Sequence, residues 1–190
     1  MAAGQGDTQA QFSVGLWYDS GLGVPPDHKA AMKWYRKAAD GGNDAAQNNL
    51  GRMFEDGRIV PQDYAEAVSW FRKAAEQNNA AAQFNLGRMY ENGRGVTRDY
   101  AEAMHWYRKA ADQGDAAAQF NLGTLYCSGR GVTEDYIEAH KWFKLASSRF
   151  PAGEKEQRDR AVQNGSLVAS KMTAAQIAEA QKRAREWTLS

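Results

Sequence analysis

The chain has 190 residues, a formal net charge of +1, and nearly equal numbers of basic residues (24) and acidic residues (23). This balance gives no electrostatic case for a nucleic-acid partner or a membrane surface. No stretch is apolar enough to insert into a bilayer, and the single cysteine, Cys127, excludes a disulfide within the chain.

The first residues do not contain a basic start followed by an apolar run, so they do not predict a secretory signal. The segment 2–7 (AAGQGD) instead aligns in register with the segment 110–115 (AADQGD). We therefore expect residues 1–6 to be the remnant of a preceding repeat, in a chain cut from a longer protein. A processed N-terminal extension is the alternative.

From residue 7 onward the sequence repeats with a period of 36 residues. Glycines and tryptophans mark the period most clearly: Gly15, Gly51, Gly87 and Gly123, then Trp34, Trp70, Trp106 and Trp142. A fixed period of this length is typical of a solenoid, in which each repeat buries its apolar face only against its neighbours. The sequence predicts one array without an internal boundary, built from the repeats 7–42, 43–78, 79–114 and 115–150.

Each repeat is predicted to be a helical hairpin, as the third repeat illustrates. Asn79 is a good N-cap for the first helix, because its side-chain oxygen can accept from an unpaired backbone N–H. Gly93 can take the left-handed conformation that ends this helix. Asp99 then caps the second helix, and Glu102 three residues later completes a D-x-x-E capping box. The first repeat has an alanine, Ala30, at the glutamate position.

The glycine inside each first helix costs roughly 1 kcal/mol against alanine, so its recurrence predicts close helix–helix approach. The tryptophans of the second helices recur in register with alanines and are predicted to lie in the core. Left-handed residues are expected to end these helices: Gly42, Asn78 and Gly114.

The period stops at Phe150-Pro151, and residues 151–190 read as two further helices, near 153–164 and 174–187. The first is expected to end at Asn164-Gly165, and the second to begin with a capping box from Thr173 to Gln176. An apolar stripe follows in the second: Ile177, Ala180, Ala184 and Trp187. We expect these helices to cap the array, because a solenoid must cover its last apolar face. A docking element for a partner helix is the alternative.

The string A-x-x-N-L-G-x-M-Y-x-x-G-R-G-V-x-x-D-Y-x-E-A-x-x-W-Y-x-K-A-A, which begins at Ala82, resembles the Sel-one-like repeat family, relatives of the tetratricopeptide repeat. The resemblance covers residues 2–150, and the tail KMTAAQIAEA (171–180) looks like the ending of bacterial members. It implies an all-α fold, a right-handed αα-hairpin solenoid, and a non-enzymatic scaffold or adaptor that binds a protein or peptide. Bacterial cytoplasm and periplasm both remain open.

In the related tetratricopeptide fold the first helix of each repeat lines a concave groove. Two positions per repeat point into it, and they correspond to Phe12 and Leu16, Asn48 and Arg52, Phe84 and Arg88, and Phe120 and Thr124. One turn further on lie Asp19, Glu55, Glu91 and Cys127. The resemblance thus implies a groove for a segment with apolar side chains and one or two acidic groups.

Other interpretations of these residues stay open. Phe84 and Phe120 could pack between repeats, and Arg52 and Arg88 could lie on a solvated face paired with Glu55 and Glu91. The loop arginines are expected to satisfy the carbonyls at helix ends: Arg58, Arg94 and Arg130.

No catalytic residues, metal ligands or cofactor motif emerge from the sequence. Its histidines occupy different places in their repeats, and it contains no H-x-x-x-H, S-x-x-K or G-x-S-x-G. We therefore expect no enzyme. Two alternatives to a peptide-binding scaffold stay open. One is a small-molecule or cell-wall binder, including a β-lactam binder or hydrolase. The other is a structural spacer that associates with copies of itself through its exposed first repeat.

Overall fold

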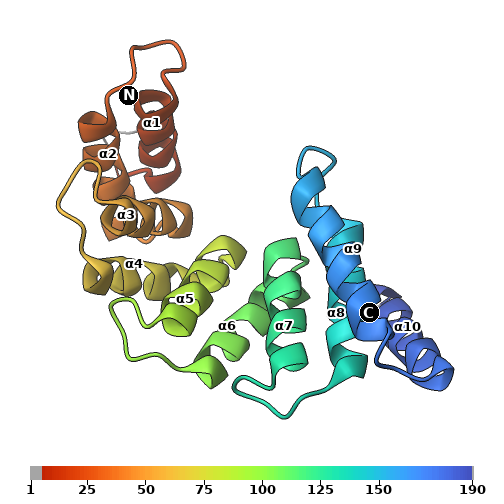
Figure 1. Cartoon of the computed structure of the whole chain (residues 1–190). Coiled ribbons are helices and arrows are strands. Elements are labelled where there is room, and N and C mark those ends of the chain that lie inside the picture. Colours follow the sequence, from red (N-terminus) through yellow and green to blue (C-terminus); the bar gives the residue numbers. More distant parts are fainter. Residues whose placement is uncertain (1–5, 190) are drawn as a thin grey trace. The chain divides into compact units, whose positions relative to one another are not determined.

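The computed structural model describes residues 6–189, so the expected repeat remnant at residues 1–6 lies outside the described part except for Gly6. Residues 6–189 form ten α-helices and no strand, which confirms the all-α prediction. The helices make successive antiparallel hairpins, an αα-hairpin solenoid (Figure 1). Their contacts divide the chain into two compact units, residues 1–98 and 99–190. The boundary falls in the loop of the third hairpin.

The first unit contains five helices: α1 (Thr8–Ser20), α2 (His28–Asp40), α3 (Asp44–Asp56), α4 (Tyr64–Glu76) and α5 (Ala80–Asn92). The second unit contains the other five: α6 (Tyr100–Asp112), α7 (Ala116–Ser128), α8 (Tyr136–Arg149), α9 (Lys155–Ala169) and α10 (Ala174–Leu189). Each helix from α1 to α7 is 13 residues long, as the 36-residue period requires.

The predicted caps are present at both helix ends. The side chain of Asn79 accepts from the backbone N–H of Ala82, and that of Asp99 accepts from the N–H of Glu102. Gly93 is left-handed, with φ of 65°. Left-handed residues also follow the second helices, as expected: Gly42, Asn78 and Gly114. Local sequence chemistry therefore fixes where the chain turns.

The capping box closes differently from the prediction. Asp63 caps α4 by accepting from the N–H of Glu66, but its own backbone N–H donates to the carbonyl of Phe54, at 3.0 Å. Asp135 does the same with the carbonyl of Tyr126, at 3.1 Å. The Glu66 carboxylate accepts instead from Nε1 of Trp70, at 2.9 Å. The predicted return bond is wrong here, because the loop folds back and supplies a carbonyl from the preceding helix.

The helix-interior glycines allow the two helices of a hairpin to touch, which confirms the predicted close approach. A Cβ atom added to Gly51 would lie 2.6 Å from ring carbons of Phe71, and one added to Gly123 would lie 2.8 Å from the ring of Phe143. Gly15 faces Tyr35 in the same way. These aromatic residues each follow a periodic tryptophan by one position, and the sequence analysis did not identify them.

A buried glutamine joins each hairpin to the one before it. Nε2 of Gln47 donates to the carbonyl of Ala39 at 3.1 Å, across from α3 to the end of α2. The same bond recurs one period later from Gln83 to Ala75, and again from Gln119. Each bond adds a second donor to a carbonyl in the last turn of a helix, which also accepts a backbone N–H from the following turn, as Ala39 does from Gly42 at 3.0 Å. The amide therefore fixes the distance between successive hairpins.

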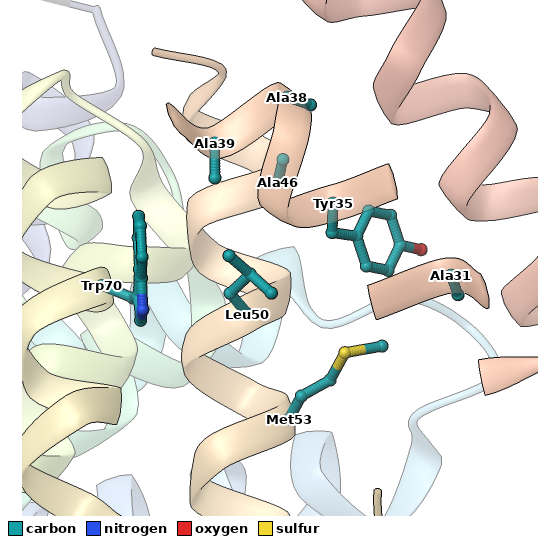
Figure 2. Packing of buried hydrophobic residues seen from close by; sticks show 8 residues of the cluster. All are labelled: Ala31, Tyr35, Ala38, Ala39, Ala46, Leu50, Met53 and Trp70. Atoms are coloured by element: carbon teal, nitrogen blue, oxygen red, sulfur yellow. The ribbon is translucent and has the colours of Figure 1, made fainter. Parts of the chain in front are cut away.

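The core of the first unit combines small and aromatic side chains from α2, α3 and α4, as Figure 2 shows (Ala31, Tyr35, Ala38, Ala39, Ala46, Leu50, Met53 and Trp70). Among the tryptophans, Trp70, Trp106 and Trp142 are buried, as predicted. The prediction is wrong for Trp34, which is only half-buried. Its ring lies under the ammonium group of Lys37, at 4.5 Å.

The last two helices pack against α8. α9 runs to Ala169, so the predicted stop at Asn164-Gly165 is wrong. Gly165 is buried inside α9, where a Cβ would lie 3.5 Å from Cβ of Phe143, and it therefore serves as a packing residue. The Thr173–Gln176 capping box of α10 is confirmed: the backbone N–H of Thr173 donates to Oε1 of Gln176 at 2.8 Å, and the backbone N–H of Gln176 donates to Oγ1 of Thr173 at 3.3 Å. Trp187 of α10 stacks edge-on with Trp142.

An ion-pair network also ties α10 to α8. Glu138, whose side chain is 14% exposed, accepts from Lys141 and from Arg183, both at 3.0 Å. Burial alone would raise the pKa of Glu138, but the hydrogen bonds and charges of Lys141 and Arg183 outweigh burial and lower it. The charged form is thus the one that the folded chain stabilises.

We predict that Gly51→Ala destabilises the protein. Phe71 is fully buried, so its ring cannot move away from a new Cβ. Overpacking costs about 1–3 kcal/mol, which exceeds the roughly 1 kcal/mol gained in helix propensity. Urea unfolding measures the difference. Gly153→Ala is the matched control, because nothing lies within 4 Å of a Cβ there. A Gly51→Ala variant as stable as the wild type would contradict the packing role.

We predict that Glu138→Gln lowers the free energy of unfolding by about 2 kcal/mol. This is less than the loss expected when one partner of a fully buried ion pair is removed, because Arg183 is partly exposed. A lowered pKa contributes stability above the unfolded value of about 4.3, and this is lost as the pH falls through the folded value. Acidification should therefore destabilise the wild type more than the variant. Thermal melts across that range measure this, with Glu156→Gln in α9 as control, because Glu156 is exposed and lies outside this network; parallel pH profiles would refute it.

Candidate functional site

A cavity of about 440 Å³ opens in the first unit between α1, α3 and the loop that follows α3. Its walls carry both charges and apolar side chains: Leu16, Asp19, His28, Asn49, Arg52, Met53, Asp56, Arg58 and Ile59. Two predicted site residues, Leu16 and Arg52, thus line the same cavity, together with Asp19 of the predicted acidic edge. This cavity is the candidate functional site.

Hydrogen bonds fix one wall of the cavity. Asp19 Oδ1 lies 2.8 Å from Nδ1 of His28, and its other oxygen accepts from the hydroxyl of Tyr35, at 3.2 Å. The pKa of Tyr35 is raised well above its usual range, first by burial and then by the negative charge of Asp19. Tyr35 therefore remains a hydroxyl donor, and both oxygens of Asp19 already have partners.

Arg52 differs from Asp19 in this respect. Its side chain is exposed at the cavity wall. Within residues 6–189 no hydrogen bond or ion pair holds its guanidinium group. A guanidinium presents a planar fork of donors that matches a carboxylate in two-point geometry. The cavity thus offers a cationic fork beside an apolar side chain, Leu16, which is 40% exposed.

Arg88, the second predicted arginine, is held by the preceding hairpin. Its Nη2 lies 2.8 Å from Oε1 of Glu55, and Nη1 donates to Asn85 at 3.3 Å. Its guanidinium also lies over the ring of Phe84, at 5.9 Å. The pairing of Arg88 with Glu55 is therefore observed, and it joins α5 to α3.

The remaining predicted residues make contacts within the protein. Asn48 is buried and accepts from Nδ2 of Asn85 at 3.0 Å, and the hydroxyl of Thr124 donates to the carbonyl of Phe120 in its own helix. Phe12 packs against Tyr35, and Phe120 against Phe143 with ring centroids 5.5 Å apart. Glu91 is half-buried in α5. Phe120 therefore packs between helices of the second unit, in agreement with the packing interpretation.

Arg94 and Arg130 satisfy helix-end carbonyls as expected, but with their backbone N–H groups, and their side chains lie over tyrosine rings. The guanidinium of Arg94 is 5.6 Å from the ring of Tyr64, and that of Arg130 is 5.8 Å from the ring of Tyr100. Each tyrosine is the first residue of a helix in the preceding hairpin. The carbonyl of Met89 is met by the backbone N–H of Arg94.

The loop after α3 differs from the later loops at Ile59, a difference that was not noticed in the sequence. The equivalent residues, Gly95 and Gly131, have φ of 70° and 74° and lie against the backbone of Tyr64 and Tyr100. A β-branched residue such as isoleucine cannot adopt this left-handed conformation in such close contact with a neighbouring backbone. Ile59 lines the candidate cavity and two neighbouring ones. The difference is visible in the sequence, where residues 56–60 read D-G-R-I-V and residues 92–96 read N-G-R-G-V.

In the described residues, no three histidine, cysteine, aspartate or glutamate side chains gather closely enough to hold a metal ion. None of the helices that the structure describes is both long and apolar enough to cross a bilayer.

The fold and its internal period define a helical repeat protein. The family model of the Sel1 repeat matches residues 8–43, 44–79, 80–115 and 116–149, and the chain belongs to the Sel1 repeat family. A Sel1 repeat protein from Oxalobacter formigenes is 34% identical, with a TM-score of 0.73, over 90% of this chain and 76% of that one.

A second solved structure is a protective antigen present in uropathogenic Escherichia coli strains that displays an SLR fold. It is 32% identical, with a TM-score of 0.62, over 97% of this chain and 46% of that one. This chain therefore spans less than half of that antigen. A comparison with curated proteins found no match.

Proposed function

We infer that this chain shares the general role of Sel1 repeats, which mediate protein–protein interactions and build proteins that are typically non-enzymatic scaffolds. We propose that this chain is such a scaffold, and that it binds a segment of a protein partner on the first helices of its hairpins. Within the first unit, the proposed binding site is the cavity lined by α1 and α3. The observation that carries the proposal is the exposed, unpaired Arg52 beside Leu16.

The chemistry of the cavity defines the segment. A carboxylate of the partner accepts from the Arg52 fork, and an apolar side chain next to it covers Leu16. Asp19 contributes mainly by holding His28 and Tyr35 in place, since its oxygens are already occupied. Arg88 has a supporting role, because its ion pair with Glu55 fixes the neighbouring hairpin.

We predict that Arg52→Glu weakens binding of the partner segment at least about tenfold, which corresponds to 1.4 kcal/mol. The measurement is fluorescence polarisation with acid-containing peptides selected by display on the whole protein. Lys144→Glu in α8 makes the same charge change on an exposed lysine and should have no effect. Circular dichroism should show unchanged helicity for both variants. If every selected peptide binds Arg52→Glu as it binds the wild type, the site lies elsewhere.

A second candidate, self-association, is supported by the exposed face of α1. Trp17 is 50% exposed, whereas the residues one and two periods later, Met53 and Met89, are buried. Leu22, in the loop after α1, is 70% exposed at the position of the loop arginines. In later hairpins the position equivalent to Trp17 is covered by the preceding helix, as Met53 is by residues of α2. We propose that a second copy of the chain covers it here.

We predict that Trp17→Lys abolishes concentration-dependent association, because a charge replaces the apolar contact. Sedimentation over a wide range of concentrations measures this. Leu167→Lys is the control, since it removes an equally exposed apolar residue from α9. A wild-type protein that stays monomeric at all concentrations would remove this candidate.

A further inference from the structure

The outer face of α2 carries four cations over an apolar floor. We call it the α2 basic surface. The cations are Lys29, Lys33, Arg36 and Lys37, and the floor is Met32, Trp34, Ile59 and Val60. Together these side chains line a cavity of about 680 Å³ in the first unit. The surface adjoins the candidate cavity, with which it shares Ile59 alone among the lining residues, and its cations are ones that the scaffold proposal does not use.

Two of the four cations are held by aromatic rings. Lys37 lies over Trp34 at 4.5 Å, and Arg36 lies over Trp70 at 4.8 Å and 3.9 Å from a carboxylate oxygen of Glu66. Lys29 and Lys33 differ, because in the described part of the chain neither has a carboxylate within ion-pair distance. They are one helical turn apart and therefore lie on the same face of α2.

One other helix of the chain carries a lysine at the position of Lys33 and shows a carboxylate beside it. Lys141 of α8 occupies the same repeat position as Lys33, and its side chain is only 9% exposed. It pairs at 3.0 Å with Glu138, the capping-box glutamate of that helix. The first repeat has Ala30 at the glutamate position, so Lys33 has no such partner and is exposed. A carboxylate is missing from α2 where three other helices carry one: Glu66, Glu102 and Glu138.

We propose that the α2 basic surface is a second docking surface, and that it binds an acidic segment of a protein partner. Two carboxylates of that segment pair with Lys29 and Lys33, and an apolar side chain enters the floor between Met32 and Trp34. The floor favours a peptide over nucleic acid, because Met32, Ile59 and Val60 are aliphatic and Lys37 already lies over the ring of Trp34, so a base finds little aromatic surface on which to stack. The nearly neutral charge of the whole chain supports the same choice, since the cations are local to one helix.

The whole protein is used with the substitution Arg52→Glu, which silences the candidate site. We predict that random peptides displayed against this variant yield binders that are rich in aspartate and glutamate and contain an apolar residue. Ala30→Glu should weaken these binders at least about tenfold, because it supplies the missing carboxylate within the chain. Ala30→Gln, of the same shape but neutral, should bind as the parent protein does. Binding should also weaken as salt rises.

The variants are chosen so that folding does not decide the outcome. A glutamate at position 30 matches three other repeats and favours the N-terminus of α2, so Ala30→Glu should melt no lower than the wild type. Lys33→Glu should abolish binding of the same peptides. Selected peptides that are neutral or basic, or that bind Ala30→Glu unchanged, would overturn the proposal. So would tighter binding of single-stranded RNA or of vesicles containing phosphatidylserine. The Arg52 results in the parent protein test the first site separately.

Discussion

The structure depends on one contact, in which an aromatic ring packs directly on the backbone of a glycine in the facing helix. Phe71 lies on Gly51 and Phe143 on Gly123, so close that a methyl group would not fit. The contact brings the two helices of a hairpin to the separation at which small residues such as Ala46 and Ala67 become fully buried. Alanine cores bury little area per residue, so close approach replaces side-chain bulk as the source of packing.

The same separation determines how hairpins join. With helices this close, the last turn of α2 lies within reach of Gln47, and the glutamine amide takes the Ala39 carbonyl in place of water. Asn48 and Asn85 add a second polar contact between hairpins. Buried amides of this kind are costly when unpaired, so they specify one register between neighbours. Apolar packing holds each hairpin together, whereas polar contacts set the step from one to the next.

Features that depend on local chemistry were predictable from the sequence, and features that depend on a tertiary partner were not. The caps at Asn79 and Asp99 and the left-handed Asn78 follow from the residues themselves. Gly165 looked like a helix stop, because only its burial against Phe143 shows it to be a packing residue. In the candidate site, the resemblance to the tetratricopeptide fold implied one surface for Leu16 and Arg52, and both line the cavity of the first unit. The pairing of Arg88 with Glu55 was open, because it required knowing which hairpin each side chain reaches.

Repeat proteins keep most positions fixed, so the positions that break the repeat carry information about function. Three such positions lie in the first two repeats of this chain: Leu22 at an arginine position, Ala30 at a glutamate position and Ile59 at a glycine position. Each change removes a contact that later repeats make internally, whether with a tyrosine ring, a lysine or a helix start. Because each repeat contacts only its neighbours, such losses stay local and leave the array folded. The unused contacts are then available to a partner, which explains why both candidate binding surfaces lie on the first unit.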